Sequence, residues 1–201
     1  MKDEIIHGPL SPHCVHVCVD MQRLFAEKTE WHTPWMERVL PVVERLAERH
    51  PKETIFTRFI PAAHPGEGEG TWKRYYERWV SMTIEALGEE MIELVPELNR
   101  FVPPAEVIDK RVYSPWLDDA LQSRLKARGT DTLIVTGGET DVCVLATVLG
   151  AVDRGYRVLV VTDGLCSSSD AAHDASLSVY HTRYGQQVET ASADTILEAW
   201  K

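Results

Sequence analysis

Three side chains in this sequence have the types needed for nucleophilic catalysis, and each lies near the end of an apolar run. Cys143 follows the segment TGGETDV, in which paired glycines allow the chain to turn sharply. Asp20 ends the run HVCVD, and Lys110 lies late in the run VIDKRV. Together, a thiol, a carboxylate and an ammonium supply a nucleophile, a base and a cation that stabilises charge.

The position of Cys143 favours a reactive thiol. Thr140 or Asp141 can cap a helix that begins here, which would place Cys143 in the first helical turn. Backbone N–H groups and the helix dipole favour a thiolate at this turn and can hold a developing oxyanion. Taken singly, each residue also has a structural interpretation, with Cys143 as an inert core cysteine, Asp20 as a helix cap and Lys110 as a solvated lysine. The combination favours a site.

The elements that would position these residues alternate between β-rich runs and helical stretches. This alternation predicts one α/β domain over residues 1–201, a three-layer α/β/α fold with a six-stranded, mostly parallel, Rossmann-like sheet. Such sheets place their sites at the carboxyl ends of the strands. The segment 60–105 is the least clear: residues 61–70 indicate a loop rich in Pro and Gly, WKRYYERWV at 72–80 suggests a short helix, and ELVPELNRF is interpreted as irregular. Strands are expected at 16–20, 54–59, 107–112, 132–137, 157–163 and 187–191, and helices at 34–50, 117–128, 141–154, after a cap at 167–170, and at the C-terminus.

Three segments resemble the isochorismatase-like cysteine hydrolases, whose members include N-carbamoylsarcosine amidase, nicotinamidase and biuret hydrolase. They are VDMQRLF at 19–25, DKRVYSPW at 109–116 and GGETDVCVLATVLGAVDRGYRVLVVTDG at 137–164. The resemblance runs from Val17 to about Tyr180 and carries nothing usable over 60–105. Three motifs in the right order and spacing make it specific.

The resemblance implies a catalytic triad of Asp20, Lys110 and Cys143. In such enzymes the Asp takes the thiol proton, the Lys stabilises the charged pair, and the thiolate attacks an amide carbonyl to give a thioester. The oxyanion is expected at the backbone N–H groups of Glu139 and Cys143, with a cis peptide bond between Gly138 and Glu139. The implied strand order, 3-2-1-4-5-6, does not explain how Lys110 reaches the other two residues. Glu139 departs from the small or apolar residue common there, so its side chain could face the pocket or a neighbouring subunit.

Substrate-binding candidates follow from the same alignment of motifs. Phe25, Tyr113 and Trp116 occupy aromatic positions of the family, although core packing is an alternative for each. Arg58, near the end of the second strand, could bind a substrate carboxylate or form a surface salt bridge. Four more aromatic residues lie outside the motifs, where they could form a lid, a core or a subunit contact: Trp72, Tyr75, Tyr76 and Trp79.

The sequence predicts neither a metal nor a cofactor. Nicotinamidases of this family bind a metal through an Asp-x-His and a later His after the second strand, where this chain reads TRFIPAAHPG. His64 stands there without further ligands, whereas a zinc site needs three or four. We therefore expect a substrate other than nicotinamide. Family members that cleave the vinyl ether of isochorismate lack the cysteine, so Cys143 favours amide or ureide chemistry.

Composition limits the partners and the compartment. The 201 residues carry a formal net charge of -10, which argues against nucleic acid and anionic membranes as main partners. The N-terminus shows no secretory signal, and the four cysteines include no C-x-x-C pair, so we expect a cytoplasmic protein with reduced thiols. The expected partner is a small amide or ureide, and the resemblance implies a homo-oligomer, either a dimer or a tetramer.

The function expected is cysteine-dependent hydrolysis of a C–N bond in a small amide, ureide or N-carbamoyl compound. One alternative is a scaffold or ligand-binding protein of the same fold with an idle triad. A nucleotide-binding Rossmann protein is disfavoured because G-x-G-x-x-G is missing after the strand that precedes Cys143. A thiol redox protein would need a resolving cysteine, for which Cys166 is the candidate.

Overall fold

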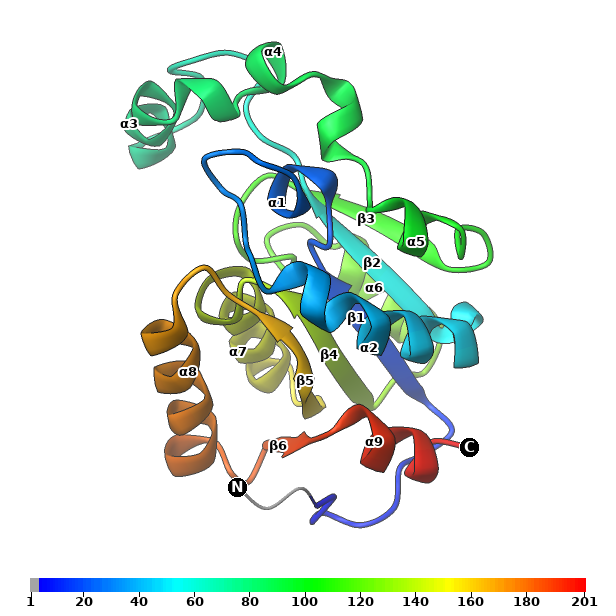
Figure 1. Cartoon of the computed structure of the whole chain (residues 1–201). Helices are drawn as coiled ribbons and strands as arrows, with labels where there is room; N and C mark the ends of the chain where they lie inside the picture. Colours follow the sequence, from blue (N-terminus) through cyan, green and yellow to red (C-terminus); the bar gives the residue numbers. More distant parts are fainter. Residues whose placement is uncertain (1–3) are drawn as a thin grey trace.

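The central feature of the fold is a six-stranded sheet in the order β3-β2-β1-β4-β5-β6 (Figure 1). The structure is a computed structural model that describes residues 4–201. Every neighbouring pair of strands in this sheet is parallel. This confirms the predicted six-stranded Rossmann-like sheet, which is entirely parallel. The strands are β1 (Cys14–Val19), β2 (Thr54–Phe59), β3 (Glu106–Lys110), β4 (Thr132–Gly138), β5 (Arg157–Cys166) and β6 (Val188–Ala191).

Helices cover both faces of the sheet and give the three layers (Figure 1). Alternate side chains of β1 point to opposite faces, so Val17 belongs to the core cluster on one face of the sheet and Cys18 to the core cluster on the other. The α-helices are α1 (Arg23–Ala26), α2 (Met36–Arg49), α3 (Thr71–Arg78), α4 (Ile84–Leu87), α5 (Pro96–Asn99), α6 (Ala120–Ala127), α7 (Leu145–Asp153), α8 (Asp170–Arg183) and α9 (Ala193–Ala199).

The expected elements differ from the observed ones mainly at their ends. β2 has the predicted bounds, whereas β5 continues to Cys166 instead of stopping at residue 163. Ser169 caps α8 by accepting a hydrogen bond from the N–H of Ala172, as the serine run predicts. The helix expected at 141–154 begins with a π-helical turn, Thr140–Val144, before α7.

The segment 60–105, the least clear from the sequence, forms short helices beyond one end of the sheet, and α3 is the helix that WKRYYERWV suggests. Figure 1 shows α3 and α4 on the same side of the molecule as α1. Gln22 fastens this segment to the sheet: its amide donates to the carbonyl of Ile92 at 2.7 Å and of Phe59 at 3.0 Å, and its oxygen accepts from the N–H of Phe59 at 2.7 Å. Within residues 4–201, none of the helices combines the length and apolarity that a membrane crossing requires.

Gly137 allows β4 to approach β1 closely just before the nucleophile turn. It pairs with Val19 and has φ 103°, a conformation that residues with a Cβ rarely adopt. A Cβ added here would lie 2.1 Å from the backbone oxygen of Val19. The glycine therefore brings the turn after β4 beside the residue that follows β1, which is Asp20.

Candidate active site

Asp20 is fixed immediately after β1 at the carboxyl edge of the sheet. Its side chain is fully buried, and its backbone has φ 51°, an uncommon conformation for a non-glycine residue and one that often marks a functional position. The Thr57 hydroxyl donates to Oδ1 at 2.6 Å, and the Asp20 N–H donates to the Thr57 carbonyl at 3.1 Å. These contacts leave Oδ2 for a second donor.

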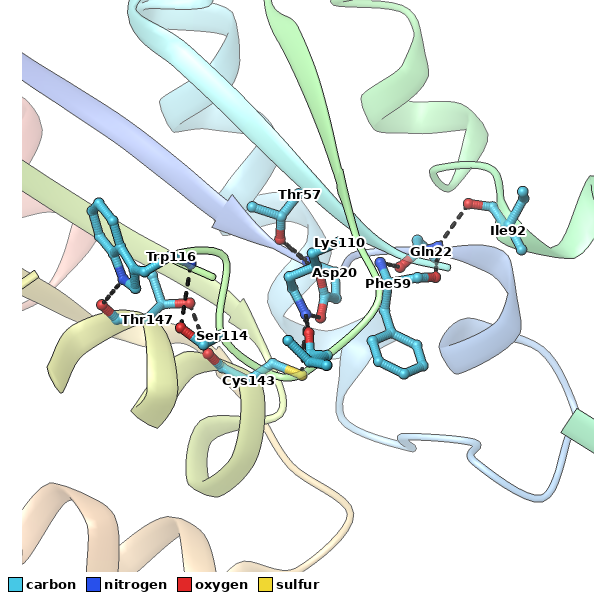
Figure 2. Close-up of polar contacts among 11 residues, drawn as sticks. Asp20, Gln22, Thr57, Phe59, Ile92, Lys110, Ser114, Trp116, Cys143 and Thr147 are labelled. Carbon is cyan, nitrogen blue, oxygen red and sulfur yellow. Dashed lines mark hydrogen bonds and ion pairs between the residues drawn. The ribbon is translucent and has the colours of Figure 1, made fainter. Parts of the chain in front are cut away.

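Lys110 supplies that donor from the end of β3, two strands away (Figure 2). Its ammonium crosses over β2, 5.1 Å from the ring centroid of Phe59, and is only 4% exposed. Nζ lies 2.7 Å from Asp20 Oδ2, 3.4 Å from Cys143 Sγ and 3.2 Å from the Val112 carbonyl. The three N–H groups of the ammonium thus match three acceptors. The length of the lysine side chain therefore explains how Lys110, two strands away from β1, reaches Asp20 and Cys143.

The charge state of Lys110 follows from this arrangement. Burial by itself lowers the pKa of the ammonium, but the charge of Asp20 and the contacts with Asp20 and Cys143 outweigh it and raise the pKa above its usual 10.5. Lys110 is therefore a cation throughout the neutral range. It holds the carboxylate and the sulfur in one buried cluster.

Cys143 lies in the π-helical turn that follows the cis peptide bond between Gly138 and Glu139. Cys143 is 5% exposed, and its backbone carbonyl accepts a hydrogen bond from the Thr147 hydroxyl at 2.7 Å. Burial raises the pKa of the Cys143 thiol well above its usual 9.0; Asp20 raises it further, and Lys110 lowers it. Burial and the charge of Asp20 therefore oppose the thiolate that Lys110 and the helical turn would favour.

A cavity of about 280 Å³ opens beside the sulfur of Cys143. Aromatic side chains make up half of its lining. The lining residues are Phe25, Glu30, Trp31, His32, Phe59, Tyr75, Trp79, Tyr113, Glu139, Val142, Cys143 and Ser168. Pockets of this kind, mainly apolar with a few polar groups, are typical of sites for small molecules.

Two of the four predicted substrate-binding residues, Phe25 and Tyr113, line this cavity. Glu139 also lines it, and its Oε1 accepts from the Ser168 N–H at 2.9 Å, so within the described chain its side chain faces the cavity. The other two predictions need correction.

Arg58 and Trp116 lie outside the cavity lining. The guanidinium of Arg58 binds both carboxylate oxygens of Asp109, at 2.8 and 3.0 Å, and Glu93 at 2.8 Å, so its charge is already neutralised. Trp116 is buried in the core, where its indole donates to the Thr147 carbonyl at 2.9 Å and packs on Gly150 (Figure 2). We therefore assign neither residue to substrate binding.

Sequence reasoning missed part of the cavity wall. Tyr75 and Trp79 come from the suggested helix at 72–80, for whose aromatic residues the alternatives were a lid, a core or a subunit contact. Trp31 and Phe59 had not been singled out, and no motif marks them. Trp72 and Tyr76 pack behind the wall instead, each within ring contact of Tyr75.

Among residues 4–201, no three His, Cys, Asp or Glu side chains are grouped so that they could hold a metal ion.

The fold and the buried Asp–Lys–Cys cluster at the carboxyl edge of the sheet define a hydrolase of the isochorismatase-like class. The family model described as the isochorismatase domain matches residues 14–192. The chain therefore belongs to the isochorismatase family, which confirms the resemblance of the three motifs.

Similar proteins agree with this assignment. Nicotinamidase 3 of Arabidopsis thaliana is 27% identical over 173 residues, 84% of this chain and 81% of the relative. Among solved structures, a cysteine hydrolase from Pseudomonas syringae pv. phaseolicola has a TM-score of 0.81 at 22% identity and covers 100% of this chain and 98% of its own. N-carbamoylsarcosine amidase from Thermoplasma acidophilum has a TM-score of 0.72 at 22% identity, covering 90% and 96%. At such identities the structures establish the shared fold.

Proposed function

We propose that this protein is a cysteine-dependent amidohydrolase that cleaves the C–N bond of a small amide, ureide or N-carbamoyl compound through a thioester. The observation that carries the proposal is the position of Lys110 Nζ, 2.7 Å from Asp20 and 3.4 Å from the sulfur of Cys143, the member of the cluster that lines the cavity. Names of similar proteins, such as nicotinamidase and N-carbamoylsarcosine amidase, support amide-type chemistry.

The raised pKa of the Cys143 thiol shapes the mechanism, because the sulfur carries its proton at rest. The Asp20 carboxylate takes this proton as Sγ attacks the carbonyl carbon, and the N–H groups of Glu139 and Cys143 stabilise the oxyanion. The leaving nitrogen takes the proton from Asp20 as the C–N bond breaks and a thioester forms. Water then attacks the thioester and gives a proton to Asp20, which passes it to the sulfur as the C–S bond breaks, so that the carboxylic acid leaves and the thiol and the Asp20 carboxylate are restored. Lys110 stays charged and stabilises each anionic stage.

An idle scaffold of the same fold is the remaining alternative. Against it, the thiol, the carboxylate and the ammonium are buried together beside a cavity, and burying two charges is costly unless they are paired and used. A structural role alone would not require the sulfur to reach the cavity wall.

The test is ammonia release from a panel of small amides, ureides and N-carbamoyl compounds. Cys143→Ala should retain less than about 1% of the wild-type rate, since loss of a nucleophile removes orders of magnitude. Cys14→Ala is the matched control. Cys14 is also buried, but it begins β1, at the end of the strand away from Asp20 and the site. The rate of Cys14→Ala should match the wild type. Turnover by Cys143→Ala at the level of the control would refute the proposal.

A further inference from the structure

Aromatic rings packed against one another form the main wall of the cavity beside Cys143. The ring centroid of Trp31 lies 6.2 Å from Phe25, 5.9 Å from Phe59, 5.8 Å from Tyr75 and 6.2 Å from Trp79. All five rings line the cavity. Rings held by one another in this way present a fixed surface, and aromatic faces attract cations as well as apolar groups.

Two acidic side chains, Glu139 and Glu30, line the cavity, together with one histidine, His32. Glu139 is half-buried and Glu30 is exposed, and no lysine or arginine is among the lining residues. Glu139 accepts one hydrogen bond, from the Ser168 N–H, and Glu30 accepts one from the Ser81 hydroxyl. Within residues 4–201, neither carboxylate forms an ion pair. Each therefore keeps a negative charge without a cationic partner.

The cations around the cavity have other contacts. Lys110 Nζ lies 5.1 Å from the ring centroid of Phe59 and the Arg78 guanidinium 5.1 Å from that of Trp79, so the rings of Phe25, Trp31 and Tyr75 are the part of the wall left for a substrate cation. The ammonium of Lys110 already faces Asp20, Cys143 and the Val112 carbonyl, so its three N–H groups are used. Arg74 and Arg78 are exposed and line a separate, more open groove, although that groove shares Tyr75 and Tyr113 with the cavity. Solvent screens charges at such exposed positions.

We propose that the substrate is a small amide or ureide with a cationic ammonium group at the end far from the bond that is cleaved. The aromatic wall and the carboxylates of Glu139 and Glu30 hold this group while the carbonyl lies at Cys143. An anionic substrate would meet two carboxylates, and no lysine or arginine lines the cavity to pair with it. This inference rests on the proposed amidohydrolase function, which it makes more specific.

Three amides of similar size measure the preference for charge. Betaine amide carries a trimethylammonium group, 3,3-dimethylbutanamide replaces its nitrogen by carbon with the same shape, and the monoamide of succinic acid carries a carboxylate. We expect kcat/KM for ammonia release to be at least about tenfold higher for the cation than for its neutral isostere, and lowest for the acid. Glu139→Gln and Glu30→Gln should each reduce the ratio of cation to neutral amide. Glu37→Gln, which removes an exposed charge outside the cavity, should leave the ratio unchanged.

A second measurement tests the same charge preference without turnover. Cys143 is modified with two methanethiosulfonate reagents, one carrying a trimethylammonium group and the other a sulfonate group. The rate of each reagent with Cys143 is divided by its rate with a small free thiol, which corrects for the intrinsic reactivity of the reagent. Cys143→Ala gives the background from the other three cysteines, which are all buried. The cationic reagent should react at least about tenfold faster than the anionic one after this correction, and the advantage should shrink in Glu139→Gln and Glu30→Gln.

The two measurements separate the inference from the function beneath it. A neutral or anionic amide that matches or exceeds betaine amide overturns the inference and leaves the amidohydrolase function standing. Equal corrected rates for the two thiol reagents also overturn it. Preference for the cationic reagent with no ammonia released from any panel compound upholds the charge selectivity of the cavity and refutes the proposed function.

Discussion

Removal of the Lys110 charge is the sharpest test of the buried cluster. Asp20 is fully buried, and its Oδ2 lies 2.7 Å from Nζ. At this separation and an effective dielectric constant of about 20, the Coulomb attraction is about 6 kcal/mol before desolvation is subtracted. Lys110→Met keeps the length and apolar volume of the side chain but leaves a buried carboxylate held by the Thr57 hydroxyl. Breaking such a pair costs about 3–5 kcal/mol of folding free energy, which urea unfolding at about pH 8 would measure.

The double variant Asp20→Asn with Lys110→Met separates the effect of the unpaired charge from the effect of changed packing. Because it removes both charges, it should be more stable than Lys110→Met alone by about 2 kcal/mol or more. Equal stability of the single and double variants would refute the idea that an uncompensated carboxylate causes the loss.

The same variant reports on the sulfur. Lys110 lowers the pKa of the Cys143 thiol, so its removal should raise that pKa and slow alkylation by neutral iodoacetamide at about pH 8 by roughly tenfold or more. Cys143→Ala supplies the background rate, which should be low because burial raises the pKa of Cys14 to about 11 and of Cys18 to about 12. Superimposed pH profiles for wild type and Lys110→Met would show that the ammonium does not act on the sulfur.

Four further outcomes are expected. Asp20→Asn should abolish ammonia release, and since the charge of Asp20 raises the pKa of the Cys143 thiol, alkylation should become faster; an unchanged alkylation rate would contradict their contact. Thr57→Val removes a 2.6 Å hydrogen bond to a buried carboxylate and should cost about 1.5–3 kcal/mol in urea unfolding; no loss would mean that another group replaces the hydroxyl. Arg58→Met should leave KM for every active substrate within about twofold, because the guanidinium faces two carboxylates; a large rise in KM would restore Arg58 to the site. Dialysis against EDTA should leave turnover unchanged, and activity lost and then restored by zinc would show a metal requirement.

The stability contribution of Lys110 also fixes a pH window. Its pKa is higher in the folded protein than the usual 10.5, so the contribution is present in full below that value and is lost as the pH rises through the folded-state pKa. The contribution of Lys110 to the free energy of unfolding is therefore constant through the neutral range. It is lost at strongly alkaline pH, where the protein should become less stable.

The sequence predicted those parts of the site that depend on topology. Asp20, Lys110 and the Cys143 turn all follow strands of a parallel sheet, and the carboxyl ends of such strands share one edge. Their meeting needs no knowledge of side-chain packing beyond the reach of a lysine. For the wall contributed by Tyr75 and Trp79, the sequence suggested a short helix at 72–80 but not its position at the cavity, because the short helices of residues 60–105 depend on contacts such as those of Gln22.

Side-chain direction explains the two incorrect assignments. Arg58 pairs directly with Asp109 in the register of β2 and β3, so a cross-strand ion pair captures its charge. Trp116 packs where α7 has Gly150: a Cβ added to that glycine would lie 2.2 Å from the indole. Both contacts join segments far apart in the sequence. A motif can place a residue near a strand end, but the neighbours that it meets there decide which way it points.

The arrangement of charges separates catalysis from recognition. Lys110 cannot hold a substrate carboxylate while its three N–H groups serve Asp20, Cys143 and a backbone carbonyl, because an ammonium has no further donor. If a substrate anion accepted one of the Lys110 N–H groups, the hydrogen bond to Asp20 or Cys143 would be lost. The substrate would then bind more tightly, but the thiolate would be less stable and kcat would fall. Recognition must then come from the aromatic wall and from Glu139, neither of which competes with the cluster for Lys110. The same geometry that makes the sulfur reactive therefore favours substrates without negative charge.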